Sequence, residues 1–168
     1  MKLRIAGIDT ESVVDGPGIR FVIFTQGCYH NCRGCHNPQT HDPNGGREIT
    51  LGELETVIEN TDHILRGITF SGGEPFLQPE PLAALADYVH GRGMNLVTYT
   101  GYTLEKLLQM SENNPAIKAL LERIDLLIDG PFKIEEKDMT LAFRGSRNQR
   151  LIDLPATLKT GEIVEWKR

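Results

Sequence analysis

The sequence predicts an α/β protein: a partial, open β/α barrel, or a wound sheet, of about five or six mainly parallel strands. Short apolar runs rich in β-forming residues alternate with segments of helical spacing, which indicates parallel strands joined by right-handed crossovers. The chain has 168 residues, too few for a complete eight-unit barrel of ~250 residues. Several of the apolar runs lead into glycine-rich or cysteine-rich loops, as strands do in proteins of this class.

In the first half of the chain, two strands, a helix and a third strand are predicted in that order. Residues 3–8 alternate loosely, and residues 21–25 form a continuous apolar run that suits a strand covered on both faces. Thr50 begins the helix with a capping-box pattern, and apolar residues keep a helical spacing as far as Leu65. The third strand occupies residues 67–70.

The second half continues the alternation of helix and strand. A helix begins near Pro79, tolerates Pro81 in its first turn and ends near Gly91. The further predicted elements are a strand at 94–100, helices at 103–109 and 116–121, and strands at 124–128, 151–152 and 162–166.

The composition is that of a soluble globular protein with a single domain spanning residues 1–168. The apolar fraction of 39% and the charged fraction of 24% argue against disorder. No apolar run approaches the ~20 residues of a membrane span, and the N-terminus becomes polar too quickly for a signal peptide. A net charge of −5 argues against broad nucleic-acid binding. We therefore expect a cytoplasmic protein with neither a nucleic acid nor a membrane as partner.

All three cysteines of the chain lie within eight residues, at Cys28, Cys32 and Cys35. Thiolates this close repel one another, so the loop is predicted to bind a metal ion or a cluster. Structural zinc sites and ordinary iron–sulfur sites use four protein ligands. Three cysteines leave one coordination position open, and an open position is where metal-based chemistry takes place. The polar loop at 36–46 is predicted to wrap this site.

The loops that follow the predicted strands carry the other polar and glycine-rich motifs. They hold the three cysteines, the sequence Gly-Gly-Glu-Pro at 72–75, Thr100 with Gly101, and Asp129 with Gly130. Because the carboxyl ends of parallel strands lie on the same edge of a sheet, these loops are expected to form one site.

These residues resemble the radical S-adenosylmethionine (SAM) superfamily. The resemblance is carried by the C-x3-C-x2-C spacing of the cysteines and by Gly-Gly-Glu-Pro after a later strand. Asp-Gly-Pro-Gly-Ile-Arg at 15–20 and Cys-His-Asn at 35–37 are similar to activators of glycyl-radical enzymes. The stretch at 143–150, Phe-Arg-Gly-Ser-Arg-Asn-Gln-Arg, resembles the anaerobic ribonucleoside-triphosphate reductase activating proteins. The likeness covers about residues 5 to 153.

The resemblance implies a partial barrel of the radical SAM type and a defined chemistry. Cys28, Cys32 and Cys35 would bind a [4Fe–4S] cluster, and S-adenosyl-L-methionine would chelate the fourth iron. Cleavage of SAM would give a 5′-deoxyadenosyl radical that takes a hydrogen atom from a glycine of the anaerobic (class III) ribonucleotide reductase. The implied electron donor is a flavodoxin or a ferredoxin. Whether the protein is a monomer or a homodimer stays open.

The same resemblance assigns roles around SAM. The backbone of Gly72 and Gly73 suits the methionine end of SAM, since glycines expose backbone polar groups to a small ligand. Glu74 either accepts a hydrogen bond from the SAM ammonium or only holds the loop. Many radical SAM proteins have an aromatic residue just before the third cysteine, where this chain has Gly34. His36 is therefore the candidate to contact adenine, and the alternative is a loop histidine bonded to local backbone.

Two further features have two interpretations each. Asp129 matches an acidic position near the SAM carboxylate or a bound cation, and it also suits a turn-initiating residue before Gly130. Arg144, Arg147 and Arg150 either form a solvated face or contact the SAM carboxylate or the partner surface.

Two other functions remain as alternatives at this stage. A radical SAM enzyme could act on another glycyl-radical protein, a small molecule or a peptide. A zinc-binding structural module could use the three cysteines with His36 or His30, but Gly-Gly-Glu-Pro after a strand has no purpose in that account.

Overall fold

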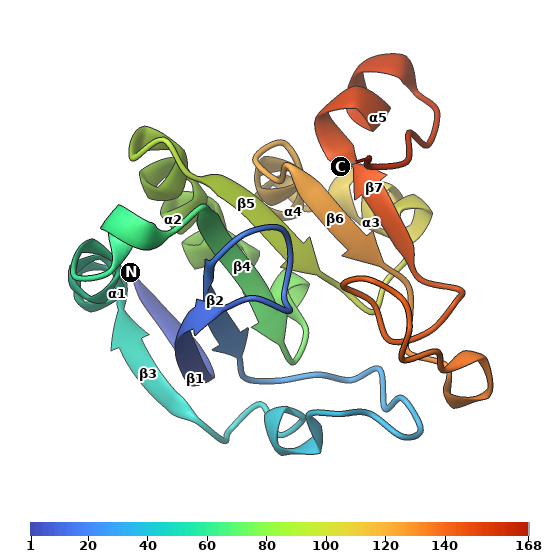
Figure 1. The fold of residues 1–168 in the computed structure, drawn as a ribbon, viewed down its shortest axis with the longest axis horizontal. Coiled ribbons are helices and arrows are strands. Elements are labelled where there is room, and N and C mark those ends of the chain that lie inside the picture. The colour runs from blue at the N-terminus through green and yellow to red at the C-terminus, as the bar shows by residue number, and fades with distance from the viewer. Residues whose placement is uncertain (168) are drawn as a thin grey trace.

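The computed structural model describes residues 1–167, so residue 168 of the predicted domain lies outside this description. One open sheet has the strand order β3-β1-β2-β4-β5-β6-β7 (Figure 1). The strands are β1 (Lys2–Ser12), β2 (Arg20–Thr25), β3 (Arg47–Thr50), β4 (Gly67–Gly72), β5 (Asn95–Tyr99), β6 (Leu126–Asp129) and β7 (Arg150–Asp153). The helices are α1 (Leu51–Glu59), α2 (Pro79–Gly91), α3 (Leu104–Ser111), α4 (Pro115–Leu121) and α5 (Leu154–Thr160).

The centre of the sheet is parallel, and its edges are antiparallel. Strands β2, β4, β5 and β6 pair in parallel, whereas β1, β3 and β7 join by antiparallel pairing. The predicted α/β class with a mainly parallel sheet is therefore confirmed. The sheet is open between its edge strands β3 and β7, as expected, and the barrel character is not confirmed. It has seven strands instead of the expected five or six.

Three elements differ from the prediction. Strand β3 was not predicted, because of its four residues only Ile49 is buried and no apolar pattern marks it. Helix α5 was not predicted, although Asp153 caps it by accepting a hydrogen bond from the Ala156 N–H (3.1 Å). The segment predicted as a strand at 162–166 contributes a single bridge, between Glu165 and Ile152.

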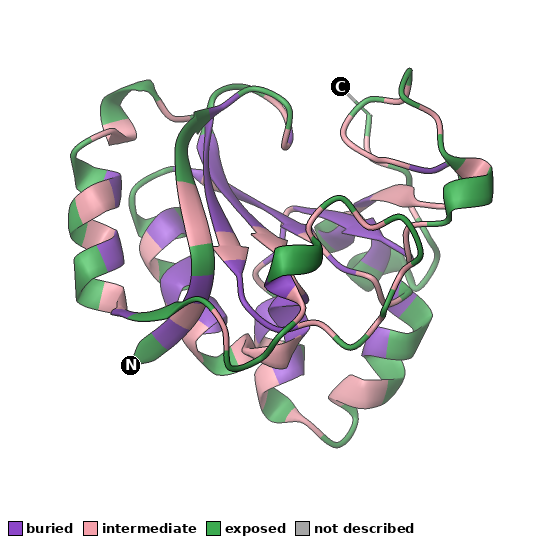
Figure 2. Ribbon diagram, turned by 90° about the horizontal axis from the view of Figure 1, so that it is seen from below, coloured by how far each residue is buried: buried purple, intermediate pink, exposed green. Residues whose placement is uncertain are grey.

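The two faces of the sheet are covered differently. Helices α1 to α4 lie behind the sheet in Figure 1, and the loop that joins β1 to β2 crosses in front of it. On the helical side, alternate strand residues such as Phe21, Phe70 and Leu127 join one large apolar core. On the other side, Val97 and Ile128 belong to a small cluster. The loop segments there are mostly exposed or partly buried (Figure 2). No helix among the described residues is long and apolar enough to cross a membrane.

The parallel pairing brings the carboxyl ends of four strands to one edge. Thr25 at the end of β2 lies opposite Gly72 at the end of β4. The N–H of Thr100, just after β5, donates to the Ile128 carbonyl of β6 (3.0 Å). The cysteines and the predicted glycine-containing loops follow these four strand ends, so the fold gathers them as expected.

Candidate functional site

The cysteine loop leaves β2 and is fastened to the loop that follows it. The Gly27 N–H donates to the Thr40 carbonyl (2.6 Å), and the Cys28 N–H donates to the His41 carbonyl (3.0 Å). Cys28, Cys32 and Cys35 are free and partly buried. All three line one cavity of about 710 Å³. The donor set of this cavity is therefore three thiols that face a shared space.

Burial controls the protonation of these thiols. It raises the pKa of Cys28 and Cys32, and the nearby negative charges of Glu74 and the other cysteines act in the same direction. A positively charged metal group would reverse this preference, because it binds the thiolate and displaces the proton. Among the described residues, no three His, Cys, Asp or Glu side chains are arranged to hold a single metal ion.

The sulfur of Cys35 has two nitrogen neighbours. The backbone N–H of Asn37 donates to the Cys35 Sγ (3.4 Å), and the His41 Nε2 lies at the same distance from it (3.4 Å). His41 is half-buried and lines the same cavity. The cavity thus brings a polarisable sulfur next to an imidazole that the sequence pattern did not single out.

The Gly-Gly-Glu-Pro loop packs directly on the start of the cysteine loop. The Gly73 N–H donates to the Thr25 carbonyl (3.0 Å), and the Glu74 N–H donates to the Gly27 carbonyl (2.8 Å). A Cβ on Gly73 would lie 2.4 Å from the Gly27 carbonyl oxygen, well inside van der Waals contact. Gly72 and Gly73 both line the cavity with the cysteines. Glycine is therefore required here by the close approach of two backbones, and it also leaves backbone exposed to the cavity.

The Glu74 carboxylate is buried and fully surrounded by donors from the chain itself. It is 1% exposed. Its oxygens accept from the Thr100 hydroxyl (2.8 and 3.0 Å) and from the N–H groups of Gly101 (2.8 Å) and Phe76 (2.9 Å), and the His30 Nε2 lies 2.6 Å away. Of the two interpretations of Glu74, this geometry favours the one in which it holds the loop.

His30 is a site residue that sequence reasoning missed, apart from naming it as a zinc ligand in the alternative function. Its ring contacts Glu74, which lies 44 positions later in the chain, and packs edge-on against Tyr102 with 4.5 Å between the ring centroids. His30 also lines the cavity. It therefore links the cysteine loop to the loops after β4 and β5. No spacing within the sequence marks such a pairing.

The position of Gly34 is explained by a distant segment. Gly34 has a φ of +77°, and an added Cβ would lie 2.7 Å from the Ile134 side chain. The neighbouring His36 packs edge-on against Phe132, with centroids 5.1 Å apart. His36 and Phe132 both line the cavity. The planar groups available on this side are thus an imidazole and a phenyl ring.

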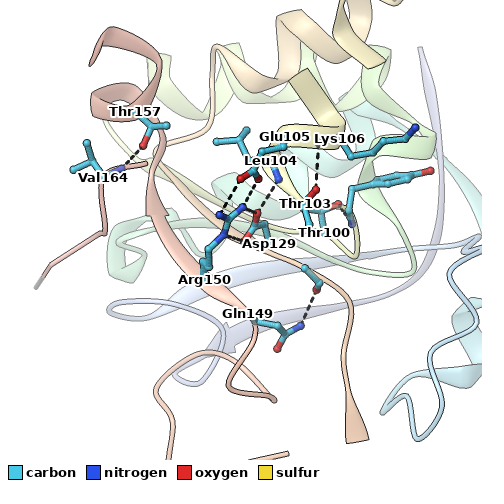
Figure 3. Close-up of polar contacts among 12 residues, drawn as sticks. Thr100, Thr103, Leu104, Glu105, Lys106, Asp129, Gln149, Arg150, Thr157 and Val164 are labelled. Carbon is cyan, nitrogen blue, oxygen red and sulfur yellow. Dashed lines mark hydrogen bonds and ion pairs between the residues drawn. The ribbon is translucent and has the colours of Figure 1, made fainter. Parts of the chain in front are cut away.

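Asp129 is engaged by its own chain (Figure 3). Its carboxylate, 1% exposed, accepts from the Arg150 Nε (3.0 Å) and Nη2 (2.5 Å) and from the Leu104 N–H (2.8 Å). Arg150 also pairs with Glu105 (2.5 Å), and this contact lowers the pKa of Glu105. Asp129 is not among the described residues that line the cavity, whereas the next residue, Gly130, is.

The three arginines near the C-terminus do not form one patch. Arg144 lines the cavity and donates to the Gln149 carbonyl (2.7 Å), while its Nε is buried without a partner among the described residues. Arg147 is exposed. Arg150 binds Asp129 and Glu105, as described above. Only Arg144 is therefore placed to meet a ligand in the cavity.

A buried arginine holds the glycine-rich turn over the open face of the sheet. Arg20 donates to the Thr69 hydroxyl (2.7 Å) and to the carbonyls of Pro17 (3.0 Å), Ile68 (2.8 Å) and Asn95 (3.2 Å). All these acceptors are neutral, and burial lowers the pKa of Arg20 to about 10. The turn is thereby fixed with Asp15 on the cavity wall.

Comparison with known proteins places this geometry in a family context. A family model described as a 4Fe-4S single cluster domain matches residues 14–152. The chain is 37% identical to the anaerobic ribonucleoside-triphosphate reductase-activating protein of Salmonella typhimurium, over 82% of this chain and 90% of that protein. It is 35% identical to the protein of the same name from Escherichia coli K12, with the same coverage.

Two more distant similarities complete the comparison. The pyruvate formate-lyase 1-activating enzyme of Escherichia coli K12 is 31% identical over 98% of this chain and 66% of its own length. A crystal structure of QueE from Escherichia coli superposes on 61% of this chain and 54% of its own, with 20% identity and a TM-score of 0.49. The sequence relatives, and not that structure, identify the family.

Proposed function

Because this chain belongs to the family of the anaerobic ribonucleoside-triphosphate reductase-activating proteins, we propose that its substrate is the glycyl-radical subunit of an anaerobic ribonucleotide reductase. The chain is a radical SAM activase, and its cofactors are a [4Fe–4S] cluster and S-adenosylmethionine. When bound, the cluster supplies the electron that cleaves SAM, and the resulting 5′-deoxyadenosyl radical takes a hydrogen atom from a glycine of the substrate protein.

The thiols of Cys28, Cys32 and Cys35 are the proposed cluster ligands. The observation that carries this assignment is that all three line one cavity together with the backbone of Gly72 and Gly73. Soft thiolate donors are the ligands that iron–sulfur clusters use. A donor set of three leaves a position for SAM.

The neighbouring residues would bind and orient SAM. Backbone polar groups at Gly72 and Gly73 would hold its methionine end. His36 would lie beside the adenine, opposite a wall that includes Phe132. Glu74 holds the loop through His30 and Thr100, and for Asp129 the contacts with Arg150 support a structural role.

The rim of the cavity suits a protein substrate. Val13, Val14 and Met139 line the cavity, and these side chains are 68%, 70% and 81% exposed. Exposed apolar groups that cluster around a polar site are typical of surfaces that dock another protein. This favours a polypeptide glycine as substrate over an enclosed small molecule.

The electron donor and the assembly belong to the same proposal. A flavodoxin or ferredoxin would reduce the cluster, and the activity would take place in the cytoplasm, where the reductase is expected. A homodimer is the assembly we propose to test first, by light scattering of the holoprotein at several concentrations.

The function is tested by anaerobic reconstitution. The protein loaded with iron and sulfide, reduced with dithionite and given SAM should release 5′-deoxyadenosine. Added reductase should then show a glycyl doublet in electron paramagnetic resonance (EPR). The Cys32→Ala variant should lose at least 90% of the SAM cleavage, about a tenfold effect or more. Cleavage by this variant at the wild-type rate would refute the ligand assignment.

A second substrate distinguishes activation of the reductase from activation of pyruvate formate-lyase. The same holoprotein is incubated with pyruvate formate-lyase, the substrate named in the more distant relative. A doublet on the reductase alone supports the proposal, and a doublet on the lyase alone would transfer the assignment to another glycyl-radical protein.

A further inference from the structure

A second cavity lies beside the first on the open face of the sheet. Its volume is about 600 Å³, and it shares Val13 and Phe143 with the cysteine cavity. Its other walls include the turn at Gly16–Gly18, then Arg66 just before β4, and Asn95 at the start of β5. The cysteine cavity lies at the carboxyl ends of these strands, and the second cavity lies at their amino ends.

The two cavities are neighbours along the strands, because Val13 and Phe143 line both of them. The strands between their ends have five or six residues, and an extended chain rises about 3.3 Å per residue. An extended segment of about five residues would span from the cysteines to the second cavity. A polypeptide substrate whose glycine sits at the cysteines would continue into it.

The second cavity is positively charged. Arg66 and Lys167 line it, both exposed, and no Asp or Glu is among its described lining residues. The guanidinium of Arg20 lies behind the turn, and all its hydrogen-bond acceptors are neutral. The carboxylate of Asp125 offsets part of its charge. Burial is the main cause that lowers the pKa of Arg20, Asp125 opposes it, and Arg66 lowers the pKa further, so the positive charges of Arg66 and Arg20 act on the same region.

The wall between the two cavities is aromatic. The ring of Phe143 packs edge-on against Trp166 with centroids 6.3 Å apart. Phe143 has a φ of +65°, a left-handed backbone that bulky side chains rarely adopt. The Tyr99 hydroxyl donates to its carbonyl (2.5 Å) and helps to hold it there. The ring is thus fixed where it can contact a chain passing from one cavity to the other.

We propose that this second cavity is a docking subsite for the segment of the partner reductase that flanks the radical glycine, and that this segment carries an acidic side chain next to an apolar one. The acidic side chain would meet Arg66 and Lys167, and the apolar one would pack against Phe143 and Trp166. The proposal rests on the proposed function, since it concerns the same substrate chain. Neither cation is among the described residues that line the cysteine cavity.

The test reverses the two charges in the holoprotein. The variant with Arg66→Glu and Lys167→Glu should bind the reductase at least tenfold more weakly, because the cavity would then repel an acidic segment. Its affinity should also depend less steeply on salt than that of the wild type. Cleavage of SAM by dithionite-reduced protein without reductase should stay at the wild-type rate.

The matched control is the variant with Lys118→Glu and Lys159→Glu. It changes the net charge equally, at two exposed lysines in α4 and α5 outside both cavities. It should bind the reductase within about twofold of the wild type. A milder variant, Arg66→Met with Lys167→Met, should also weaken binding of the reductase. It keeps the test valid if the charge-reversed variant does not fold.

The outcomes separate the subsite from the function. If wild type activates the reductase and the reversed variant binds it as tightly as wild type, the subsite is refuted and the function stands. Equal weakening by the reversed and control variants would show a net-charge effect and also refutes the subsite. If wild type neither binds nor activates the reductase, the proposed function itself fails.

Discussion

The His41 ring contacts the Cys35 sulfur, and a substitution of this single histidine can test the effect of the contact on the cluster. Hydrogen bonds to the sulfurs of an iron–sulfur site favour its reduced state, because reduction adds negative charge. His41→Leu removes the Nε2 that lies 3.4 Å from the Cys35 Sγ. The midpoint potential of the reconstituted cluster should become more negative by on the order of 50 mV, since about 59 mV corresponds to a tenfold change in a one-electron couple.

An anaerobic redox titration followed by EPR measures this shift. The control is His63→Leu, because His63 lies in an exposed 3-10 turn far along the chain from the cysteines. It should leave the potential unchanged. A His41→Leu potential equal to or above the wild-type value would show that the ring does not donate to the sulfur.

Two buried carboxylates show where reasoning from single residues was insufficient. Glu74 and Asp129 were both candidates to bind SAM or an ion near it. Glu74 is surrounded by donors that include His30, and Asp129 is paired with Arg150. A buried carboxylate needs such donors, and which donors it finds depends on elements that are distant in sequence.

At the scale of elements, Arg150 joins β7 to β6 through Asp129 and to α3 through Glu105. Arg150→Met should lower the free energy of unfolding by about 3 kcal/mol, because it leaves the buried Asp129 without its cation. Arg150 holds the pKa of Glu105 below its usual value, so this part of the stabilisation is present at neutral pH and is lost as the pH falls.

Urea unfolding at pH 7 and near pH 4, about the ordinary pKa of Glu, measures both effects. The difference between wild type and variant should be smaller at the lower pH. Adding Asp129→Asn to Arg150→Met should restore part of the stability at pH 7. No restoration would indicate that the loss arises from packing of the Arg150 side chain and not from the unpaired charge.

The loops after β2 and β4 approach each other so closely that a methyl group should separate them. Gly73→Ala would place its Cβ 2.4 Å from the Gly27 carbonyl oxygen. We expect a loss of about 1–3 kcal/mol of stability, as for other overpacked positions, together with weaker SAM binding. Thermal unfolding and a SAM binding titration measure the two effects.

Gly52→Ala is the matched control, since Gly52 lies in α1 with no other atom within 4 Å of an added Cβ. Alanine is the better helix former, so this variant should be neutral or more stable by up to about 1 kcal/mol. If the two variants were equally stable, the two loop backbones would be able to move apart around the added methyl group without a loss of stability.

At the scale of the whole molecule, we propose that the chain is a single cooperative domain. The main apolar cluster extends from Leu3 to Leu154 and joins residues of helices and strands throughout. Trp166, the only tryptophan, packs at the small cluster on the opposite face. In urea, its fluorescence and the far-ultraviolet circular dichroism should therefore change in one coincident transition. Two separate transitions would divide the chain into independent units.

The sequence by itself determined the chemistry and the order of the elements. The spacing of Cys28, Cys32 and Cys35 predicted a cluster loop, and the apolar runs predicted the parallel strands of the sheet, because both signals are local in the chain. The family comparison then confirmed the resemblance to reductase activators. The short edge strand β3 left no such signal, since only Ile49 within it is buried.

Only the tertiary structure decided which side chains meet. It paired His30 with Glu74 and Arg150 with Asp129, and it filled the space beside Gly34 with Ile134. It also aligned the second cavity with the first along the open face of the sheet. Periodicity and spacing in a sequence reflect the arrangement of residues that are close together in the chain. These contacts join distant segments that only the packing of the sheet brings together.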